Sequence, residues 1–178
     1  MFFAATPDRP EGEIVPSDVF GAHCDVFGPN LAVRRAAIDD QAMFNRGFFA
    51  GPHGLMGEDT DFVRRLAARG YKVGFTPRAR VRHIVLPEQT TWRWILRRCY
   101  RHGRFSFVMA NLTYVGEASP APKFPRWRIR RVITAALTLP IIALGFNKRR
   151  LFVHLKRIAY DLGALDQAKV ANPGFAAS

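Results

Sequence analysis

The pattern of apolar and polar positions divides the first third of the chain into irregular segments. Residues 4–18 have no period and are rich in Pro and acidic residues, which predicts an extended lead-in over residues 1–20. Residues 26–38 combine a Gly-Pro-Asn turn with a short apolar stretch, which predicts a loop, a strand and the start of a helix. Residues 44–57 hold four glycines and a proline among aromatic residues, so we expect a loop there.

A helix is predicted directly after the adjacent acids Glu58 and Asp59. Its apolar residues recur at helical spacing, and its arginines are expected to face solvent. The apolar positions are Phe62, Val63, Leu66 and Ala67, and the basic positions are Arg64, Arg65 and Arg69. Asp59 or Thr60 is expected to cap the start of the helix, and Gly70 is expected to end it.

Two short strands are predicted after this helix. Residues 71–75 alternate between apolar and polar positions at period two. A second alternation follows Pro77, with arginines on one face and a His on the apolar face. The first face carries Arg78, Arg80 and Arg82, and the second carries Ala79, Val81 and His83.

Residues 89–104 predict a strongly basic amphipathic helix. One stripe is apolar or aromatic, and arginines surround the other side. The stripe consists of Trp92, Ile95, Leu96, Cys99 and Tyr100, and the arginines are Arg93, Arg97, Arg98, Arg101 and Arg104.

A membrane-associated helical tail is predicted for residues 126–165, after a linker over residues 106–125. Basic residues flank an apolar run of 15 residues, 132–146. Such a run rises about 22 Å as a helix, less than the ~30 Å hydrocarbon core of a bilayer, and Pro140 interrupts it. We therefore favour an in-plane or re-entrant segment over a full span, with a soluble core helix as the third alternative. Residues 166–178 are expected to be disordered.

Composition and charge narrow the possible partners. The chain has 178 residues and a net charge of +13, enough length for one folded domain with a tail. Residues 1–61 carry 4 Lys/Arg and 10 Asp/Glu, whereas residues 62–178 carry 23 and 4. The basic part predicts an anionic partner. A membrane surface suits it better than nucleic acid, because the apolar run lies between arginine clusters. No nucleic-acid partner is expected.

The expected location is the cytoplasmic face of the cell membrane, peripheral or re-entrant. Cys24 and Cys99 lie far apart in sequence, and no secretory signal opens the chain. Both features favour a reducing compartment.

The order of these segments resembles the acceptor-side half of family-2 inverting glycosyltransferases with a nucleotide-sugar-binding GT-A fold. The resemblance rests on "GPNLAVRRAAID", a Gly/Phe-rich loop and "GEDTDFVRRLAARGYKVGFTPRARVRH", and it covers about residues 21–105. The matching positions are Asn30, Arg34-Arg35, Glu58-Asp59, Gly70-Tyr71, Pro77 and His83. It implies an α/β fold: an incomplete mixed sheet with flanking helices, followed by the helical membrane-associated tail.

The resemblance also implies roles for individual residues. Asp59 would be the general base that deprotonates the acceptor hydroxyl, and Glu58 beside it would raise its affinity for that proton. Asn30 and Arg34 would bind acceptor or phosphate. A divalent metal, Mg²⁺ or Mn²⁺, is expected as cofactor, and a nucleotide sugar as donor. The alternative is that these acids only cap a helix and complement its dipole.

Three further sets of residues are candidates with weaker signals. His83 either completes the metal site, as the resemblance implies, or is an ordinary core residue. Arg93 and Trp94 resemble the end of a Q-x-x-R-W acceptor motif, but one extra residue separates them from Gln89, which favours a membrane-facing helix over processive synthesis. The expected membrane-facing residues are Trp92, Arg97, Arg101, Trp127 and Arg130.

The resemblance lacks the family's donor-binding half. Neither a Gly/Pro-rich nucleotide-binding unit nor a metal-binding D-x-D at a strand end precedes Gly21. The D-x-D of Asp59-Thr60-Asp61 opens a helix, so it is not assigned to metal. The sequence therefore predicts a glycosyltransferase fragment that acts on a lipid-linked or polysaccharide acceptor. A non-enzymatic basic membrane-binding module is the alternative.

Overall fold

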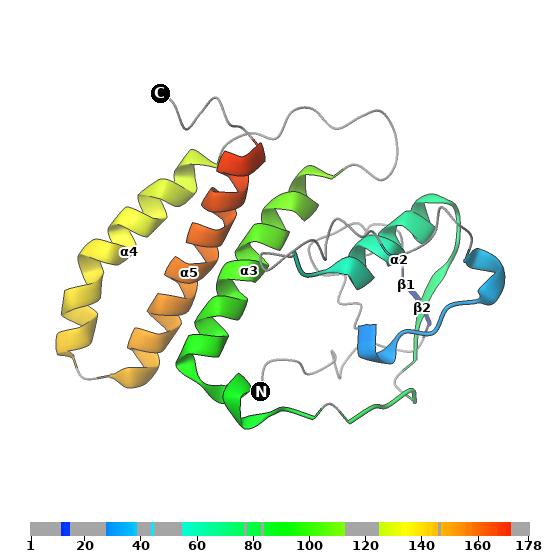
Figure 1. Ribbon diagram of the computed structural model, residues 1–178, viewed down its shortest axis with the longest axis horizontal. Helices are drawn as coiled ribbons and strands as arrows, with labels where there is room; N and C mark the ends of the chain where they lie inside the picture. Colours follow the sequence, from blue (N-terminus) through cyan, green and yellow to red (C-terminus); the bar gives the residue numbers. More distant parts are fainter. Residues whose placement is uncertain are drawn as a thin grey trace. The chain divides into compact units, whose positions relative to one another are not determined.

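The computed structural model describes residues 12–14, 28–38, 44, 55–76, 78–82, 84–112, 125–145 and 147–171. The chain divides into two compact units. The first contains the described residues up to Ile84, and the second contains the described residues from Val85 onward. Both units can be followed in Figure 1.

The first unit is built around one helix and a short antiparallel ladder. Its elements are β1 (Gly12–Ile14), η1 (Gly28–Asn30), η2 (Arg35–Ala37), α2 (Glu58–Ala68) and β2 (Val73–Phe75). β1 pairs with β2 so that Glu13 lies opposite Gly74. Over the described residues this is the one strand pairing. The predicted incomplete mixed sheet is therefore not seen there, although the strand expected at residues 71–75 is confirmed as β2.

The apolar face of α2 forms the core of this unit. Phe62, Val63 and Leu66 are buried, as the helical spacing predicted, and they form a cluster with Ala37 of η2. The prediction that Arg64 faces solvent is wrong, because its exposed fraction is only 7%. The apolar stripe of α2 is therefore flanked by one arginine that the fold covers.

Two glycines with positive φ define the ends of α2. Gly57 precedes the helix at φ 90°, so the predicted caps Asp59 and Thr60 instead lie inside its first turn. Gly70 follows at φ 88°. Its N–H donates to the Ala67 carbonyl at 2.9 Å, and the Tyr71 N–H donates to the Leu66 carbonyl at 3.1 Å. This is a Schellman motif, which confirms Gly70 as the stop.

Two other predicted elements of this unit are not formed. Residues 28–38 contain the short turns η1 and η2 where a strand and a helix start were expected. Residues 78–82 are irregular and exposed where a second strand was expected. An alternating pattern of apolar and polar residues does not by itself provide hydrogen-bond partners for the backbone of a strand. Among the described residues, no neighbouring strand pairs with this segment.

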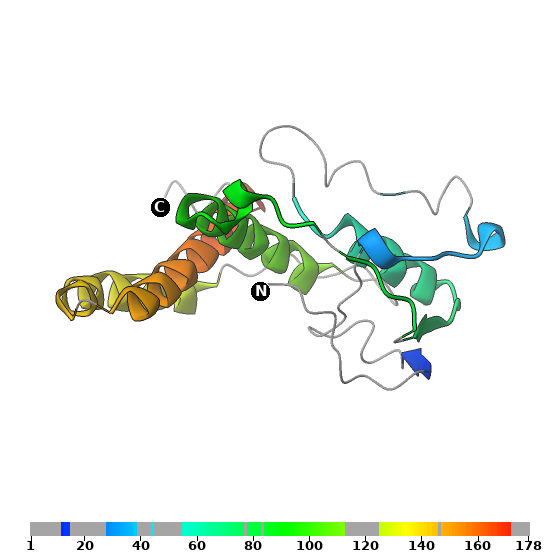
Figure 2. The same cartoon turned by 90° about the horizontal axis from the view of Figure 1, so that it is seen from below.

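The second unit is helical throughout its described part. It contains η4 (Pro87–Thr90), α3 (Trp92–Asn111), α4 (Arg126–Leu144) and α5 (Lys148–Ala171). α5 packs against both α3 and α4, which Figures 1 and 2 show on its two sides. No described helix is both long and apolar enough to cross a bilayer.

The helix boundaries differ from the sequence expectations. The helix expected from Gln89 begins at Trp92, because the Thr91 hydroxyl caps it by accepting from the Trp94 N–H at 3.3 Å. It continues to Asn111, so the first residues of the predicted 106–125 linker are helical. Likewise α5 continues to Ala171 and includes half of the predicted disordered end, 166–178.

Glycines allow α3 and α5 to cross at backbone contact. A Cβ added to Gly103 would lie 1.8 Å from the Tyr160 carbonyl oxygen, and one added to Gly163 would lie 1.9 Å from the Tyr100 carbonyl oxygen. Around this crossing Phe107 packs with Ala164 and Ala168. Small residues on both helices thus set the separation of the pair.

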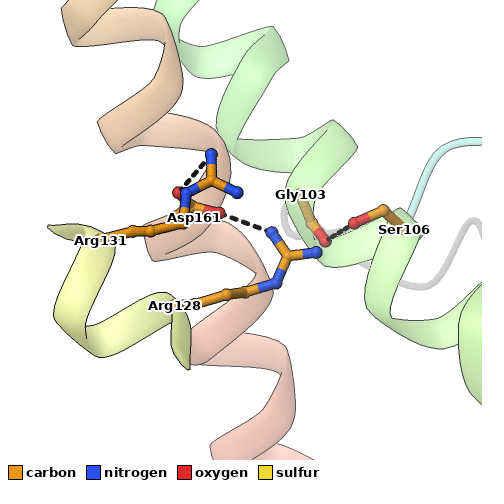
Figure 3. Close-up of polar contacts among 5 residues, drawn as sticks. All are labelled: Gly103, Ser106, Arg128, Arg131 and Asp161. Carbon is orange, nitrogen blue, oxygen red and sulfur yellow. Dashed lines mark hydrogen bonds and ion pairs between the residues drawn. The ribbon is translucent and has the colours of Figure 1, made fainter. Parts of the chain in front are cut away.

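An ion-pair cluster joins α4 to α5. Asp161 of α5 is buried and pairs with Arg128 at 2.6 Å and Arg131 at 3.2 Å, both from α4, as Figure 3 shows. The Arg128 guanidinium also lies 4.6 Å from the Trp127 ring centroid and 5.3 Å from that of Tyr160. The buried carboxylate therefore has two cationic partners, and one of these stacks between aromatic rings.

Replacing this carboxylate should loosen the α4–α5 pair. Asp161→Asn is expected to lower the free energy of unfolding by about 2 kcal/mol, less than for a fully buried pair because half of the Arg131 side chain is exposed. Urea denaturation followed by circular dichroism measures the change. Asp166→Asn, on the same helix but half-exposed, is the control with a smaller expected loss. Equal losses of stability in the two variants would contradict the role of Asp161 as the buried carboxylate that joins α4 to α5.

Candidate functional site

The acidic residues at the start of α2 lie where a helix favours negative charge. Glu58, Asp59 and Asp61 occupy its first turn, and the Asp61 N–H makes the first backbone bond, to the Gly57 carbonyl at 2.9 Å. Glu58 and Asp59 are half-buried, whereas Asp61 is 2% exposed. The helix N-terminus therefore stabilises the negative charge of all three acids, and the side chains of Glu58 and Asp59 remain accessible to solvent.

Two backbone N–H groups fix the Asp59 carboxylate. The Gly28 N–H donates to Oδ2 at 2.7 Å, and the Thr60 N–H donates to Oδ1 at 2.8 Å. A carboxylate oxygen can accept two hydrogen bonds, so each oxygen keeps capacity for a further donor such as a hydroxyl group. The carboxylate is thus oriented by the protein and remains able to accept a proton.

The turn that holds Asp59 is itself tied to the segment after β2. The Asn30 side-chain amide donates to the Ala79 carbonyl at 2.7 Å. Since Gly28 and Asn30 belong to the same short turn η1, this bond fixes the turn whose N–H contacts Asp59. The structure thus brings together two of the predicted site residues, Asn30 and Asp59. Asn30 uses its amide within the protein in this state.

Asp61 differs from Asp59 in its surroundings. Its carboxylate pairs with Arg65 at 2.9 Å, one helical turn later, and is buried. The two carboxylates of the D-x-D therefore do not share one environment. Over the described residues, no group of three or more His, Cys, Asp or Glu side chains is placed to hold a metal ion. His83 lies outside the described residues.

The other predicted binding residues belong to other elements of the chain. Arg34 is exposed at the start of η2, and its carbonyl accepts from the Ala37 N–H at 2.9 Å. Arg93 and Trp94 lie in the first turn of α3, in the helical unit, where Arg98 stacks over the Trp94 ring at 5.4 Å. Within the described contacts, none joins Arg34 to Asp59.

The residues predicted to face a membrane all belong to the helical unit and are exposed; they are Trp92, Arg97, Arg101, Trp127 and Arg130. Trp92 also packs on Phe152 of α5, with ring centroids 4.8 Å apart. Its ring therefore contributes to helix packing as well as to the surface.

Sequence reasoning missed Gly28 as a site residue. Its contribution is a backbone N–H, which leaves no side-chain signature. The available signal was its place directly before Pro29 and Asn30, because Gly-Pro-Asn is typical of a turn. A Cβ at this position would lie 3.2 Å from Asp59 Oδ2, which also explains why a glycine suits it.

One comparison with known proteins finds a match. The family model described as glycosyl transferase family group 2 matches residues 13–158, most of both units. No curated protein and no solved structure matches the chain. The matched range includes the acidic turn of α2 and the helices α3 and α4.

Proposed function

The chain belongs to glycosyl transferase family group 2, and from this we propose that, together with a donor-binding half of the family type, it transfers a sugar from a nucleotide-sugar donor to an acceptor hydroxyl, with Asp59 as general base. The observation that carries the assignment is the Asp59 carboxylate, half-buried at a helix start and oriented by the Gly28 N–H. A sugar hydroxyl is a poor nucleophile at neutral pH. A fixed carboxylate within hydrogen-bond reach removes its proton as the new bond forms.

The proposed reaction is an inverting displacement. The acceptor oxygen attacks the anomeric carbon from the face opposite the nucleoside diphosphate. The carbon–oxygen bond to the diphosphate breaks, its electron pair leaves with the diphosphate, and the hydroxyl proton moves to Asp59. Glu58, also in the first turn of α2, adds a second carboxylate next to the proposed base. We also propose the GT-A fold for the complete catalytic domain, by family resemblance.

Acceptor binding is proposed for four residues on two surfaces. Arg34 is an exposed cation suited to phosphate, and Asn30 lies in the turn next to Asp59. Arg93 and Trp94 present a guanidinium and an aromatic ring in the first turn of α3. These chemistries fit a lipid-linked or polysaccharide acceptor at the cytoplasmic face of the membrane.

A divalent metal, Mg²⁺ or Mn²⁺, remains part of the proposal because the family resemblance implies it. When bound, such an ion would neutralise the charge that develops on the departing diphosphate. The described residues do not form a fitting set of ligands, since Asp61 is buried against Arg65. The steps above therefore assign only the proton transfer and acceptor binding to this chain.

Donor consumption tests the proposed function directly. The purified chain, combined with a donor-binding half of the family type, is incubated with membranes, Mg²⁺ or Mn²⁺ and a panel of nucleotide sugars, and the released nucleoside diphosphate and the glycosylated products are measured. We expect one donor to give membrane-dependent diphosphate release together with a labelled lipid or polysaccharide. Release that equals the protein-free rate for every donor would overturn the proposal.

A substitution in the turn η1, which contacts Asp59, should slow the reaction. In Gly28→Ala the new Cβ displaces the Asp59 carboxylate by a few tenths of an ångström, because the two would lie 3.2 Å apart. We expect kcat to fall about tenfold, since small misplacements of a catalytic group are costly. Gly145→Ala, whose Cβ meets only ordinary contacts at 3.6 Å and beyond, should keep parental kinetics. Unchanged kcat in Gly28→Ala would argue against this contact.

A further inference from the structure

A row of large apolar side chains lies exposed along α4. Its members are spaced by four, four and three residues, so they share one helix face. They are Ile133 (54% exposed), Leu137 (73%), Ile141 (71%) and Leu144 (73%). We call them the α4 stripe. It extends about 16 Å along the helix axis.

The α4 stripe is not covered by the helix that packs on α4. α5 contacts α4 through other positions: His154 Nε2 lies 2.7 Å from the Ala135 carbonyl, and Asp161 pairs with Arg128. These contacts lie on the face of α4 that packs against α5, whereas the residues of the stripe are exposed. Figures 1 and 2 show α4 and α5 side by side. Four exposed Leu and Ile residues in a row on the protein surface indicate an interaction site.

The charges around the stripe point to one class of partner. Towards its N-terminal end the same helical row continues as Arg126 and Arg130, both exposed. Beyond its C-terminal end come Lys148, Arg149 and Arg150, also exposed. Residues 118–160 contain ten Lys/Arg and no Asp or Glu. An apolar band between cationic ends complements a bilayer with anionic head groups.

We propose that the α4 stripe docks in the plane of an anionic lipid surface. The apolar side chains enter the boundary between head groups and acyl chains, while the cations at both ends contact lipid phosphates. An in-plane orientation places both cationic ends at the same depth. This docking surface does not depend on Asp59, so it stands apart from the proposed function.

A second copy of the chain suits the stripe less well. Packing two stripes together would bring Arg126 and Arg130 of each copy close to further cations, in a segment without an acidic residue to pair with them. Like charges that meet in this way oppose association. A lipid surface supplies the missing negative charge.

Vesicle flotation tests the docking surface. The full chain is mixed with vesicles of phosphatidylcholine alone or with about a quarter phosphatidylglycerol, at low and high salt. We expect binding to the anionic vesicles only, weakened by salt. Leu137→Gln/Ile141→Gln should bind at least about tenfold more weakly. Lys148→Gln/Arg149→Gln/Arg150→Gln should bind up to about a hundredfold more weakly at low salt, at about fivefold per cation.

The matched control is Val170→Gln, an exposed apolar residue of α5 outside the stripe, which should bind like the parent. Circular dichroism checks that each variant keeps its helices. Equal binding by the stripe variant and the parent would overturn the proposal, and so would failure of the parent to bind anionic vesicles. A parental dimer that the stripe variant converts to monomers, with vesicle binding unchanged, would assign the stripe to a second copy.

Discussion

Asp59→Asn is expected to lower kcat by about 10²–10⁴-fold, the range that a positioned general base contributes. The amide has nearly the same shape as the carboxylate, but it cannot take the acceptor proton. Donor binding should change little, because the substitution leaves the rest of the molecule in place. Steady-state kinetics with the donor and acceptor identified by product analysis measures both quantities. Turnover near the parental rate would remove Asp59 from the role of base.

The neighbouring acids separate this role from simple stabilisation of the helix. If negative charge at the start of α2 were all that mattered, then Glu58→Gln, Asp59→Asn and Asp61→Asn would act alike and mainly lower stability. A catalytic Asp59 instead makes its own variant the one with a large loss in kcat. Asp61→Asn should lower the free energy of unfolding with little loss in kcat for the folded protein, because its carboxylate is buried against Arg65.

The Asn variant also perturbs the two hydrogen bonds that orient Asp59. Its single amide oxygen can accept from Gly28 or from Thr60, whereas the carboxylate accepts from both. Asp59→Glu therefore provides a second test. It keeps the charge and the proton acceptor but moves the oxygens, so we expect partial activity. Activity of Asp59→Glu below that of Asp59→Asn would contradict a general-base role.

Local sequence signals predicted α2 well. Its apolar spacing identified Phe62, Val63 and Leu66 as core residues, and Gly70 as its end. These features depend on residues three or four apart, which the sequence shows directly. The predicted start of α2 is less accurate. Gly57, with a positive φ, occupies the cap position where Asp59 or Thr60 was expected. A glycine in that role resembles an ordinary loop glycine in sequence.

Contacts between distant segments were beyond sequence reasoning. Gly28 lies 31 residues before Asp59, and its backbone N–H is the contributing group. Asp161 lies 33 residues after Arg128, and neither residue type specifies the other as its partner. The acidic pair was found because chemistry and family resemblance both indicated it. The backbone N–H groups that orient Asp59, and the ion-pair cluster between α4 and α5, depend on how the chain packs and are visible only in the structure.

Gly103→Ala should produce a large loss of stability in the helical unit. The new methyl group would lie 1.8 Å from the Tyr160 carbonyl oxygen, far inside van der Waals contact, and the obstacle is backbone rather than a flexible side chain. α3 and α5 must then move apart and lose the contacts of Phe107 with Ala164 and Ala168. We expect the free energy of unfolding to fall by about 3 kcal/mol or more, at or above the usual cost of overpacking. Urea denaturation followed by circular dichroism measures it.

The reciprocal glycine tests whether the crossing itself is responsible. Gly163→Ala should cost a similar amount, because its Cβ would lie 1.9 Å from the Tyr100 carbonyl oxygen. The double variant should lose less than the sum of the single losses, since one separation of the helices relieves both clashes. Gly145→Ala, with its nearest neighbour at 3.6 Å, should stay within about 0.5 kcal/mol of the parent. If the two crossing variants were as stable as Gly145→Ala, α3 and α5 would not meet at these glycines.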